Sequence, residues 1–241
     1  WEERNKLNYW SDVITDFEMI RDRMQERQGV LFEMAMRMFA LWQERLAAPP
    51  SPDLLSRMIH SDAMDHMDQK EFIGNMALLI VAGNDTTRNT MSGFFDAINQ
   101  WPDEWDKIMA LIPNATNELI RWQSPVLHMR RTVTEDHEFR GQLLREGDRM
   151  VMWYVSGNRD EEMFDDPARF NVERENARRH IAFGYGVHRC VGARLAELQI
   201  NTLIATLRDR GLRPQLAGDI KREPNNFVSQ ISQVPVRLGK A

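Results

Sequence analysis

Helix-favouring residues dominate the first hundred positions, and this bias most constrains the fold. In residues 29–46 apolar residues recur at intervals of three and four, which predicts one face of an amphipathic helix. Three prolines in residues 47–52 end this helix, because proline lacks an amide N–H and restricts the residue before it. A longer helix is predicted over residues 69–100, with Asp68 as its N-cap and Trp101-Pro102 after its end.

A different pattern begins near residue 129, where alternation replaces the helical periodicity. Alternating apolar and polar side chains are typical of strands, and Gly141 and Gly147 mark turns between them. We predict strands at 131–134, 138–140 and 150–155, helices at 114–122 and 192–210, and a closing hairpin at 227–238. The predicted fold class is therefore mainly α with small β-sheets.

Composition excludes several classes of protein and of binding site. The net charge is -5 at pH 7, which disfavours nucleic acid as a partner. Mean hydropathy is -0.52 and no apolar run reaches 18 residues, so we expect no transmembrane segment. The single cysteine, Cys190, excludes an internal disulfide framework and a multi-cysteine zinc site. It is compatible with the reducing cytoplasm, where we expect the protein to be located.

The predicted helix at 69–100 carries polar residues at its middle. Gly83 lies in the helix interior, where glycine costs roughly 1 kcal/mol relative to alanine, and Asn, Asp and Thr follow it. Two interpretations remain open. Neighbouring groups satisfy a polar patch, or a ligand passes close to Gly83 while Asp85 and Thr86 move protons.

The cysteine lies among glycines just before the helix predicted at 192–210. Free backbone N–H groups and the positive end of the helix dipole favour the thiolate form of Cys190. Gly186 and Gly192 would let the backbone wrap closely around a large object at the sulfur. The alternatives are an inert buried cysteine and a nucleophile with His188 as its base.

Two further segments carry charged residues that are unremarkable alone. Glu118 and Arg121 are three residues apart on one helix face, which is also the spacing of a plain surface ion pair. Arg169 lies in a predicted loop with a turn at Pro167.

Together these segments resemble the cytochrome P-450 superfamily of haem-thiolate monooxygenases. Its cysteine-loop pattern F-x-x-G-x-[RH]-x-C-x-G is filled without a gap by Phe183, Gly186, His188, Cys190 and Gly192. Its oxygen-activating helix motif [AG]-G-x-[DE]-T is matched by Ala82, Gly83, Asp85 and Thr86, and its E-x-x-R by Glu118 and Arg121. Stretches at 81–90, 152–161 and 188–192 resemble the bacterial branch that hydroxylates alkanes and fatty acids at the terminal carbon.

The resemblance implies a cofactor and a role for each matching residue. The cofactor would be haem b (iron protoporphyrin IX), with the Cys190 thiolate as the axial iron ligand. Further haem contacts would come from His188, His180, Arg131, Phe183, Gly186, Gly192, Ala82 and Gly83. Thr86 would hydrogen-bond dioxygen and Asp85 would supply protons, whereas Glu118, Arg121 and Arg169 would form a structural cluster.

The resemblance also implies a reaction and partners. The enzyme would hydroxylate a small apolar substrate, a medium-chain alkane or fatty acid, with dioxygen and two electrons. The substrate pocket would be lined by Leu78, Ala82, Val126, Leu127, Phe227 and Val228. Electrons would come from a ferredoxin-type donor with its ferredoxin reductase, since the chain has no flavin or dinucleotide glycine motif. The donor would dock on a basic cluster of Arg178, Arg179, Arg189 and Arg194, unless internal salt bridges neutralise that face.

The resemblance also predicts the organisation of the chain and what differs from the family. Residues 1–67 would be a helical segment of the substrate-side lobe and residues 68–241 the haem-binding and oxygen-activating core, in one continuous fold. Family members are longer, and the chain begins at Trp1 with neither Met nor a secretory signal, so we expect a fragment with poor solubility and weak turnover. The alternative functions are a haem-binding fragment without turnover, and a bacterial monooxygenase with a terpenoid or steroid substrate. A cysteine-dependent hydrolase or a helical interaction protein is a further alternative.

Overall fold

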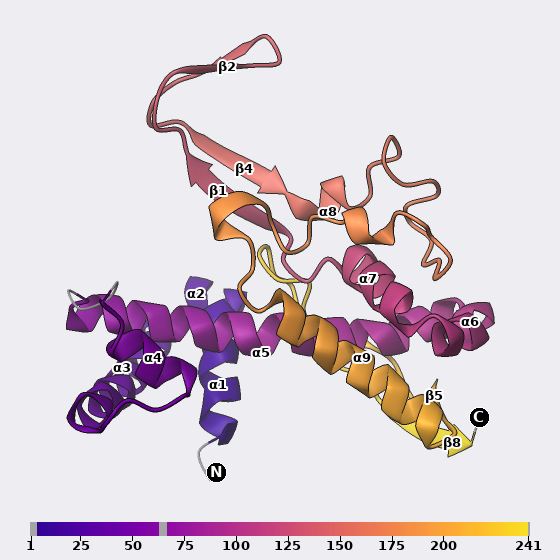
Figure 1. Ribbon diagram of the computed structural model, residues 1–241, viewed down its shortest axis with the longest axis horizontal. Helices are drawn as coiled ribbons and strands as arrows, with labels where there is room; N and C mark the ends of the chain where they lie inside the picture. The colour runs from indigo at the N-terminus through magenta and orange to yellow at the C-terminus, as the bar shows by residue number, and fades with distance from the viewer. Residues whose placement is uncertain (1–3, 63–66, 241) are drawn as a thin grey trace. The chain divides into compact units, whose positions relative to one another are not determined.

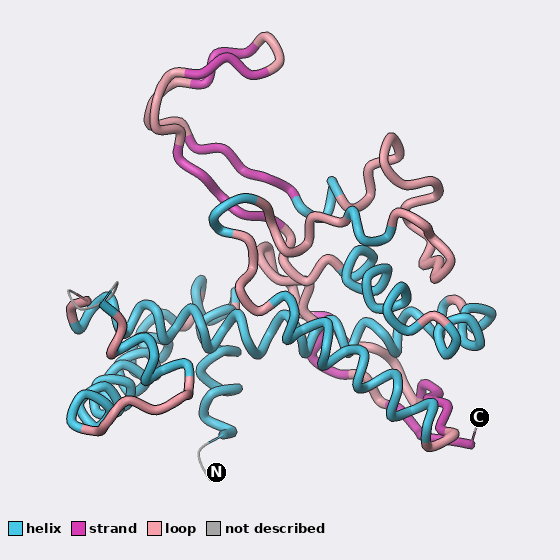
Figure 2. Tube along the Cα trace, viewed as in Figure 1, coloured by secondary structure: helices cyan, strands magenta, loops and turns pink. Residues whose placement is uncertain are grey.

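The computed structural model describes residues 4–62 and 67–240 of the chain. The chain divides into two compact units, Trp1–Asp85 and Thr86–Ala241, and the boundary falls within one long helix, α5 (Gln69–Gln100). Helices dominate, and short strands occur in the second unit (Figure 1, Figure 2). The predicted fold class, mainly α with small β-sheets, is confirmed, whereas the division predicted after residue 67 stays a prediction.

The first unit is a set of helices around a methionine-rich core. It contains α1 (Arg4–Thr15), α2 (Phe17–Arg21), α3 (Met24–Ala47), α4 (Leu54–Ile59) and the N-terminal half of α5. Methionine suits such a core, because its flexible side chain fills irregular gaps between helices. The buried residues of this core are Trp10, Met34, Met38, Ile59, Phe72, Met76 and Ile80.

Acidic side chains cap the start of α4 and of α5. Asp53 Oδ1 accepts a hydrogen bond from the backbone N–H of Ser56 at 3.0 Å. Asp68 Oδ1 accepts from the N–H of Glu71 at 2.8 Å, and Glu71 Oε2 accepts from the N–H of Asp68 at 3.4 Å. This reciprocal pair is a capping box, and it confirms the N-cap predicted at Asp68.

The second unit packs helices around a separate aliphatic and aromatic core. The C-terminal half of α5 is joined there by α6 (Trp105–Ala110), α7 (Ile112–Gln123) and α9 (Ala193–Asp209), with the short helix α8 (Tyr154–Gly157). Helices α7 and α9 correspond to the helices predicted at 114–122 and 192–210. Fully buried members of the core include Phe94, Ile108, Leu119, Phe170, Ile200 and Ile204. Within the described ranges, no helix is both long enough and apolar enough to cross a bilayer.

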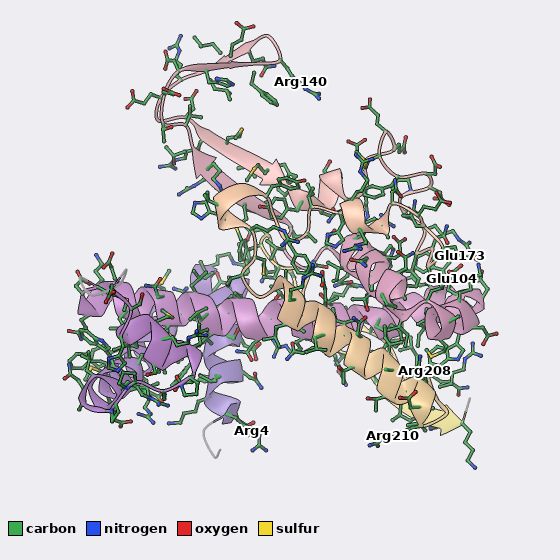
Figure 3. The ribbon with its side chains drawn as sticks, viewed as in Figure 1. Arg4, Glu104, Arg140, Glu173, Arg208 and Arg210 are labelled. Atoms are coloured by element: carbon green, nitrogen blue, oxygen red, sulfur yellow. The ribbon has the colours of Figure 1, made fainter. Side chains whose placement is uncertain are left out.

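The strands of the described residues form four two-stranded antiparallel sheets. Strand β1 (His128–Thr132) pairs with β4 (Arg149–Trp153), and β2 (His137–Phe139) pairs with β3 (Gln142–Leu144). The β2–β3 turn has φ of 50° at Arg140 and 77° at Gly141, which the primed hairpin turns require. Figure 3 shows Arg140 at the tip of this hairpin.

The closing hairpin predicted at 227–238 is wrong. Strand β7 (Ile231–Gln233) pairs with β6 (Lys221–Arg222), and β8 (Val236–Lys240) pairs with β5 (Leu212–Leu216). Only Val234 and Pro235 separate β7 from β8. A two-residue hairpin turn needs positive φ, which valine and proline do not adopt, so each strand pairs with an earlier segment instead.

Candidate functional site

Helix α7 holds Glu118 and Arg121 on one face, and both side chains are fully buried. Arg121 donates from Nε to Oε2 of Glu118 at 2.7 Å and from Nη2 to Oε1 at 2.8 Å. Its remaining N–H groups donate to the backbone carbonyls of Asn158 at 2.7 Å, Pro167 at 2.8 Å and Arg169 at 3.1 Å. All five guanidinium donors therefore have an acceptor, and the pair is a buried anchor rather than a surface ion pair.

A second arginine completes this cluster, and it is Arg174 rather than the predicted Arg169. Arg174 Nε donates to Oε1 of Glu118 at 3.1 Å. The Arg169 side chain is 40% exposed and pairs with Asp103 at 2.9 Å and Glu104 at 3.4 Å. Only the Arg169 carbonyl reaches the cluster, where both buried arginines donate to it. The prediction fails because the loop turns the Arg169 carbonyl inward and its side chain outward.

Asn158 connects the Glu118–Arg121–Arg174 cluster to the segment that carries the cysteine. Its carbonyl accepts from Arg121, and its Nδ2 donates to the hydroxyl of Ser124 at 2.9 Å. Its Oδ1 accepts from the backbone N–H of Ile181 at 2.7 Å. Asn158 is fully buried, so one side chain fixes where the cysteine loop begins relative to α7.

The cysteine loop, residues 181–190, is closed by its own backbone. The N–H of Gly184 donates to the carbonyl of Ile181 at 2.8 Å, and the N–H of Cys190 donates to that of Phe183 at 2.8 Å. Gly184 and Gly186 have φ of 70° and 73°, a region that favours glycine. These two glycines, of which Gly186 belongs to the motif, therefore give the loop the turns that bring Cys190 back to Phe183.

Helix α9 begins at Ala193, three residues after Cys190, with Gly192 as an N-cap that makes no side-chain hydrogen bond. No side chain therefore caps the first backbone N–H groups of α9. Their positive partial charge lies at the end of the cysteine loop that carries Cys190. Cys190 is exposed, and Val187 and Val191 on either side of it are 96% and 91% exposed. An exposed thiol between two exposed valines is the kind of surface that a large apolar group would cover.

Two histidines of the second unit have a buried ring nitrogen without a hydrogen-bond partner among the described residues. They are Nδ1 of His180 and Nδ1 of His128, and the His180 ring lies edge-on to Phe183 at 5.4 Å. Burial lowers the pKa of His180 to about 4, although the charge of Glu197 acts in the opposite direction. An unpaired buried imidazole indicates a polar partner that the described chain does not itself supply.

The other residues predicted to contact haem propionates lie nearer to solvent. His188 is exposed on the cysteine loop. Arg131 lies half-buried on β1, where its Nη1 donates to the carbonyl of Arg130 at 2.9 Å. Both side chains can therefore reach an anionic group without first breaking a buried contact.

These features fit the haem that the sequence resemblance implies. The Cys190 thiol is accessible as a ligand, and His180 Nδ1 offers a polar contact to an anionic edge of the group. A Cβ added at Gly186 or at Gly83 would meet no atom within 4 Å, so the space beside both backbones is open. Within the second unit, the residues that could hold the haem are therefore Cys190, His180, His188, Arg131 and the glycines of the cysteine loop.

The predicted proton-transfer residues lie at the middle of the continuous helix α5. Ala82 and Gly83 are exposed, whereas Asp85 is buried. Thr15, the last residue of α1, donates from its hydroxyl to Oδ2 of Asp85 at 3.0 Å. Thr86 is half-buried, and its carbonyl accepts from a hydroxyl one turn later in the helix.

The structure brings together four of the six residues predicted to line the substrate pocket. Val126 and Val228 form an antiparallel β-bridge, and the N–H of Leu127 donates to the carbonyl of Phe227 at 2.9 Å. The other two, Leu78 and Ala82, are exposed on the part of α5 that belongs to the first unit.

The sequence did not point to Thr15 in the first unit, nor to His128, Asn158 and Arg174 in the second. Asn158 lies inside the 152–161 stretch that carried part of the family resemblance, so a signal for it was present. Arg174 is one of several arginines in a loop without periodicity. Thr15 is 70 residues from its partner Asp85, and His128 carries no motif, so no local signal identified them.

Comparison with known proteins identifies the family. The family model described as "Cytochrome P450" matches residues 97–210. The chain is 41% identical over 239 residues to linalool 8-monooxygenase from Pseudomonas putida, covering 97% of this chain and 58% of that protein. It is 33% identical over 247 residues to a steroid C26-monooxygenase from Mycolicibacterium smegmatis, covering 97% of this chain and 60% of that protein.

A solved structure, cytochrome P450-153 from Novosphingobium aromaticivorans, is similar over nearly the whole chain. The TM-score is 0.89 at 46% sequence identity, covering 97% of this chain and 58% of that one. The chain thus spans about three-fifths of the length of the relatives that it matches. The residues of the cysteine loop and of the α7 cluster fall inside the region matched by the family model. These likenesses agree with the motifs and with the exposed thiol, and the chain belongs to the cytochrome P-450 family.

Proposed function

We propose that the protein is a haem-thiolate monooxygenase that hydroxylates an apolar substrate with dioxygen and two electrons. The observation that carries the proposal is the closed cysteine loop, which presents an exposed Cys190 between exposed valines at the uncapped start of α9. A haem held by the Cys190 thiolate would supply the activation of dioxygen. The chain's own residues bind the haem, orient it and deliver protons.

Cys190 binds the iron, and the loop around it sets the position of the sulfur. The hydrogen bond from the Cys190 N–H to the Phe183 carbonyl holds the loop closed. A Cβ at Gly186 would meet nothing within 4 Å and one at Gly192 only Cys190 Sγ at 3.8 Å, so both glycines would leave room for a haem at the sulfur. His180, His188 and Arg131 bind the propionates, which gives the unpaired Nδ1 of His180 an anionic partner.

Proton delivery falls to Thr86 and Asp85 on α5. Ala82 and Gly83 leave an open surface on the helix for dioxygen beside them. Thr86 donates a hydrogen bond toward the dioxygen, and Asp85, the next residue, supplies protons from its buried position.

The substrate class that we propose is a medium-chain alkane or fatty acid, hydroxylated at the terminal carbon. Apolar lining by Leu78, Ala82, Val126, Leu127, Phe227 and Val228 suits an alkyl chain. The 81–90 and 152–161 stretches and the similarity to cytochrome P450-153 support this branch. A terpenoid or a steroid is the alternative, which the linalool and steroid monooxygenases among the relatives favour.

Electrons come from a ferredoxin-type donor that is reduced by its ferredoxin reductase, in the cytoplasm. Three arginines of the basic cluster, Arg178, Arg179 and Arg189, are exposed near the cysteine loop. The fourth, Arg194, forms a salt bridge with Glu197 at 2.8 Å, so it contributes less net positive charge. An acidic donor would be attracted to the remaining three charges.

The absorption spectrum of the reduced, carbon-monoxide-treated holoprotein tests the proposal. We expect the strongly red-shifted Soret band of a thiolate-ligated haem, its loss in Cys190→Ser, and its retention in the control Arg140→Ala at the hairpin tip. A red-shifted band that persists in Cys190→Ser would exclude Cys190 as the ligand. Haem binding without oxygen-dependent product formation would favour the haem-binding protein without turnover.

A binding titration separates the substrate classes. An alkane, a fatty acid, a terpenoid alcohol and a steroid are added in turn to the haem-loaded protein, and the Soret shift caused by substrate binding is followed. We expect saturating shifts with the alkane or the fatty acid at lower concentrations than with the other two. Tighter binding of the terpenoid or the steroid would favour the alternative.

A further inference from the structure

Thr15 and Asp85 form a buried hydrogen bond between α1 and α5, inside the first unit. The Thr15 hydroxyl lies 3.0 Å from Oδ2 of Asp85, and both residues are buried. A carboxyl group in such a position is oriented by the hydroxyl that contacts it. The role of Asp85 in proton supply therefore depends on a residue outside its own helix.

The same hydroxyl has two further possible acceptors in its own helix. Thr15 Oγ1 lies 3.1 Å from the backbone carbonyl of Ser11, one turn earlier in α1, and 3.4 Å from that of Asp12. A hydroxyl carries one proton and two lone pairs, so it donates to one of these oxygens at a time. It donates to Asp85 when that carboxyl is ionised. When Asp85 is protonated, Thr15 donates to Ser11 and accepts from the carboxyl O–H.

We propose that Thr15 is the positioning residue for Asp85 and that its hydroxyl switches acceptor each time Asp85 changes protonation state. When Asp85 gives up its proton toward the dioxygen side, the Thr15 O–H turns from the Ser11 carbonyl to the new carboxylate. When water returns a proton to Asp85, the O–H turns back. Each cycle moves one proton through Asp85 and leaves Thr15 unchanged.

The inference rests on the proposed proton-supply role of Asp85, and it separates Thr15 from an ordinary helical threonine. A threonine that bonds only to the carbonyl one turn earlier is found at Thr202 in α9, where Oγ1 donates to the carbonyl of Leu198 at 2.7 Å. Such a bond belongs to the helix alone. The Thr15 hydroxyl also contacts the Asp85 carboxylate on another helix. The experiment isolates the effect of this additional hydrogen bond.

The test compares Thr15→Val, which keeps the shape and removes the hydroxyl, with Thr15→Ser, which keeps the hydroxyl. Thr202→Val is the matched control, and Asp85→Asn identifies the signal. The first readout is the carboxyl ¹³C resonance of Asp85 in protein labelled with [4-¹³C]aspartate. We expect it to shift in Thr15→Val and to keep its wild-type position in Thr15→Ser and Thr202→Val.

The second readout is the fraction of consumed dioxygen released as hydrogen peroxide by the haem-loaded protein during turnover. Losing one hydrogen bond to a charged group is expected to raise this fraction roughly fivefold in Thr15→Val, with rescue in Thr15→Ser. An unshifted resonance in Thr15→Val, or an equal shift in Thr15→Ser, overturns the inference. A peroxide fraction that stays at the wild-type value in Asp85→Asn overturns the proposed role of Asp85 instead, so the two failures are distinguishable.

Discussion

Arg121 and Glu118 are joined by two hydrogen bonds, from Nε to Oε2 at 2.7 Å and from Nη2 to Oε1 at 2.8 Å, with both side chains fully buried. The pair fixes a charged group of α7 in the interior next to the loop that leads to Cys190. Even a conservative substitution of Arg121 is therefore expected to lower the free energy of unfolding strongly.

Arg121→Lys is expected to destabilise the fold by about 3–5 kcal/mol, because lysine offers three donors where the arginine now satisfies five acceptors, among them the fully buried Glu118 carboxylate. The measurement is the free energy of unfolding in urea. The control is Arg169→Lys, whose side chain is 40% exposed and should change stability by less than about 1 kcal/mol. Equal losses of unfolding free energy in the two variants would contradict the conclusion that Arg121 is a buried structural anchor.

The structure assigns the second cluster position to Arg174, so alanine substitutions at the two arginines should differ. Arg174→Ala removes a buried guanidinium that donates to Glu118 at 3.1 Å and to the carbonyls of Asp165 at 2.6 Å and Asp166 at 3.0 Å. We expect a loss of about 3 kcal/mol, because the Glu118 carboxylate stays fully buried and loses one of its charged partners. Arg169→Ala is expected to cost less than about 1 kcal/mol. Thermal unfolding of both variants measures the two losses. A larger loss in Arg169→Ala than in Arg174→Ala would show that Arg169, not Arg174, is the second arginine of the cluster.

Gly93 and Gly74 both lie in α5, and substituting alanine at these two positions is expected to change stability in opposite directions. A Cβ at Gly93 would lie 2.5 Å from Oε1 of Gln123, whose amide donates to Ser229, whereas a Cβ at Gly74 meets nothing within 4 Å. Gly93→Ala should therefore destabilise by about 1–3 kcal/mol through overpacking. Gly74→Ala should stabilise by up to about 1 kcal/mol, because alanine is the better helix former. Urea unfolding of both variants measures the difference, and stabilisation by Gly93→Ala would show that Gln123 moves aside freely.

Burial of His180 predicts a pH dependence in protein prepared without haem. Its pKa is lowered to about 4 in the folded state, below the unfolded value near 6.5, so the unfolded chain binds more protons between these two values. The stability contributed by neutral His180 is therefore fully present above pH 6.5. It is lost as the pH falls toward 4.

Urea unfolding at pH 7 and pH 5 measures this dependence, with His180→Gln as the comparison. We expect the wild type to lose more stability than the variant between the two pH values. Equal losses would mean that His180 is solvated when folded. Binding of haem is expected to weaken the dependence, because an anionic propionate beside the ring raises the pKa of His180 again.

The sequence alone determined the parts of this protein that depend on local chemistry. The helical periodicity, Asp68 and the prolines near residue 50 predicted α3 and α5, because caps and breakers act within a few residues. The cysteine-loop motif identified Cys190, because its glycines and its spacing to the following helix are all contained in ten residues.

Only the tertiary structure decided the contacts between residues that are distant in the chain. Nothing local distinguishes Arg174 from Arg169, because the path of an irregular loop determines which guanidinium faces Glu118. The strand partners of the C-terminal segment were likewise mispredicted, since alternation shows that a strand forms but not where its partner lies. The hydrogen bond between Thr15 and Asp85 follows the same principle: it joins residues 70 positions apart, and packing of α1 on α5 alone brings them together.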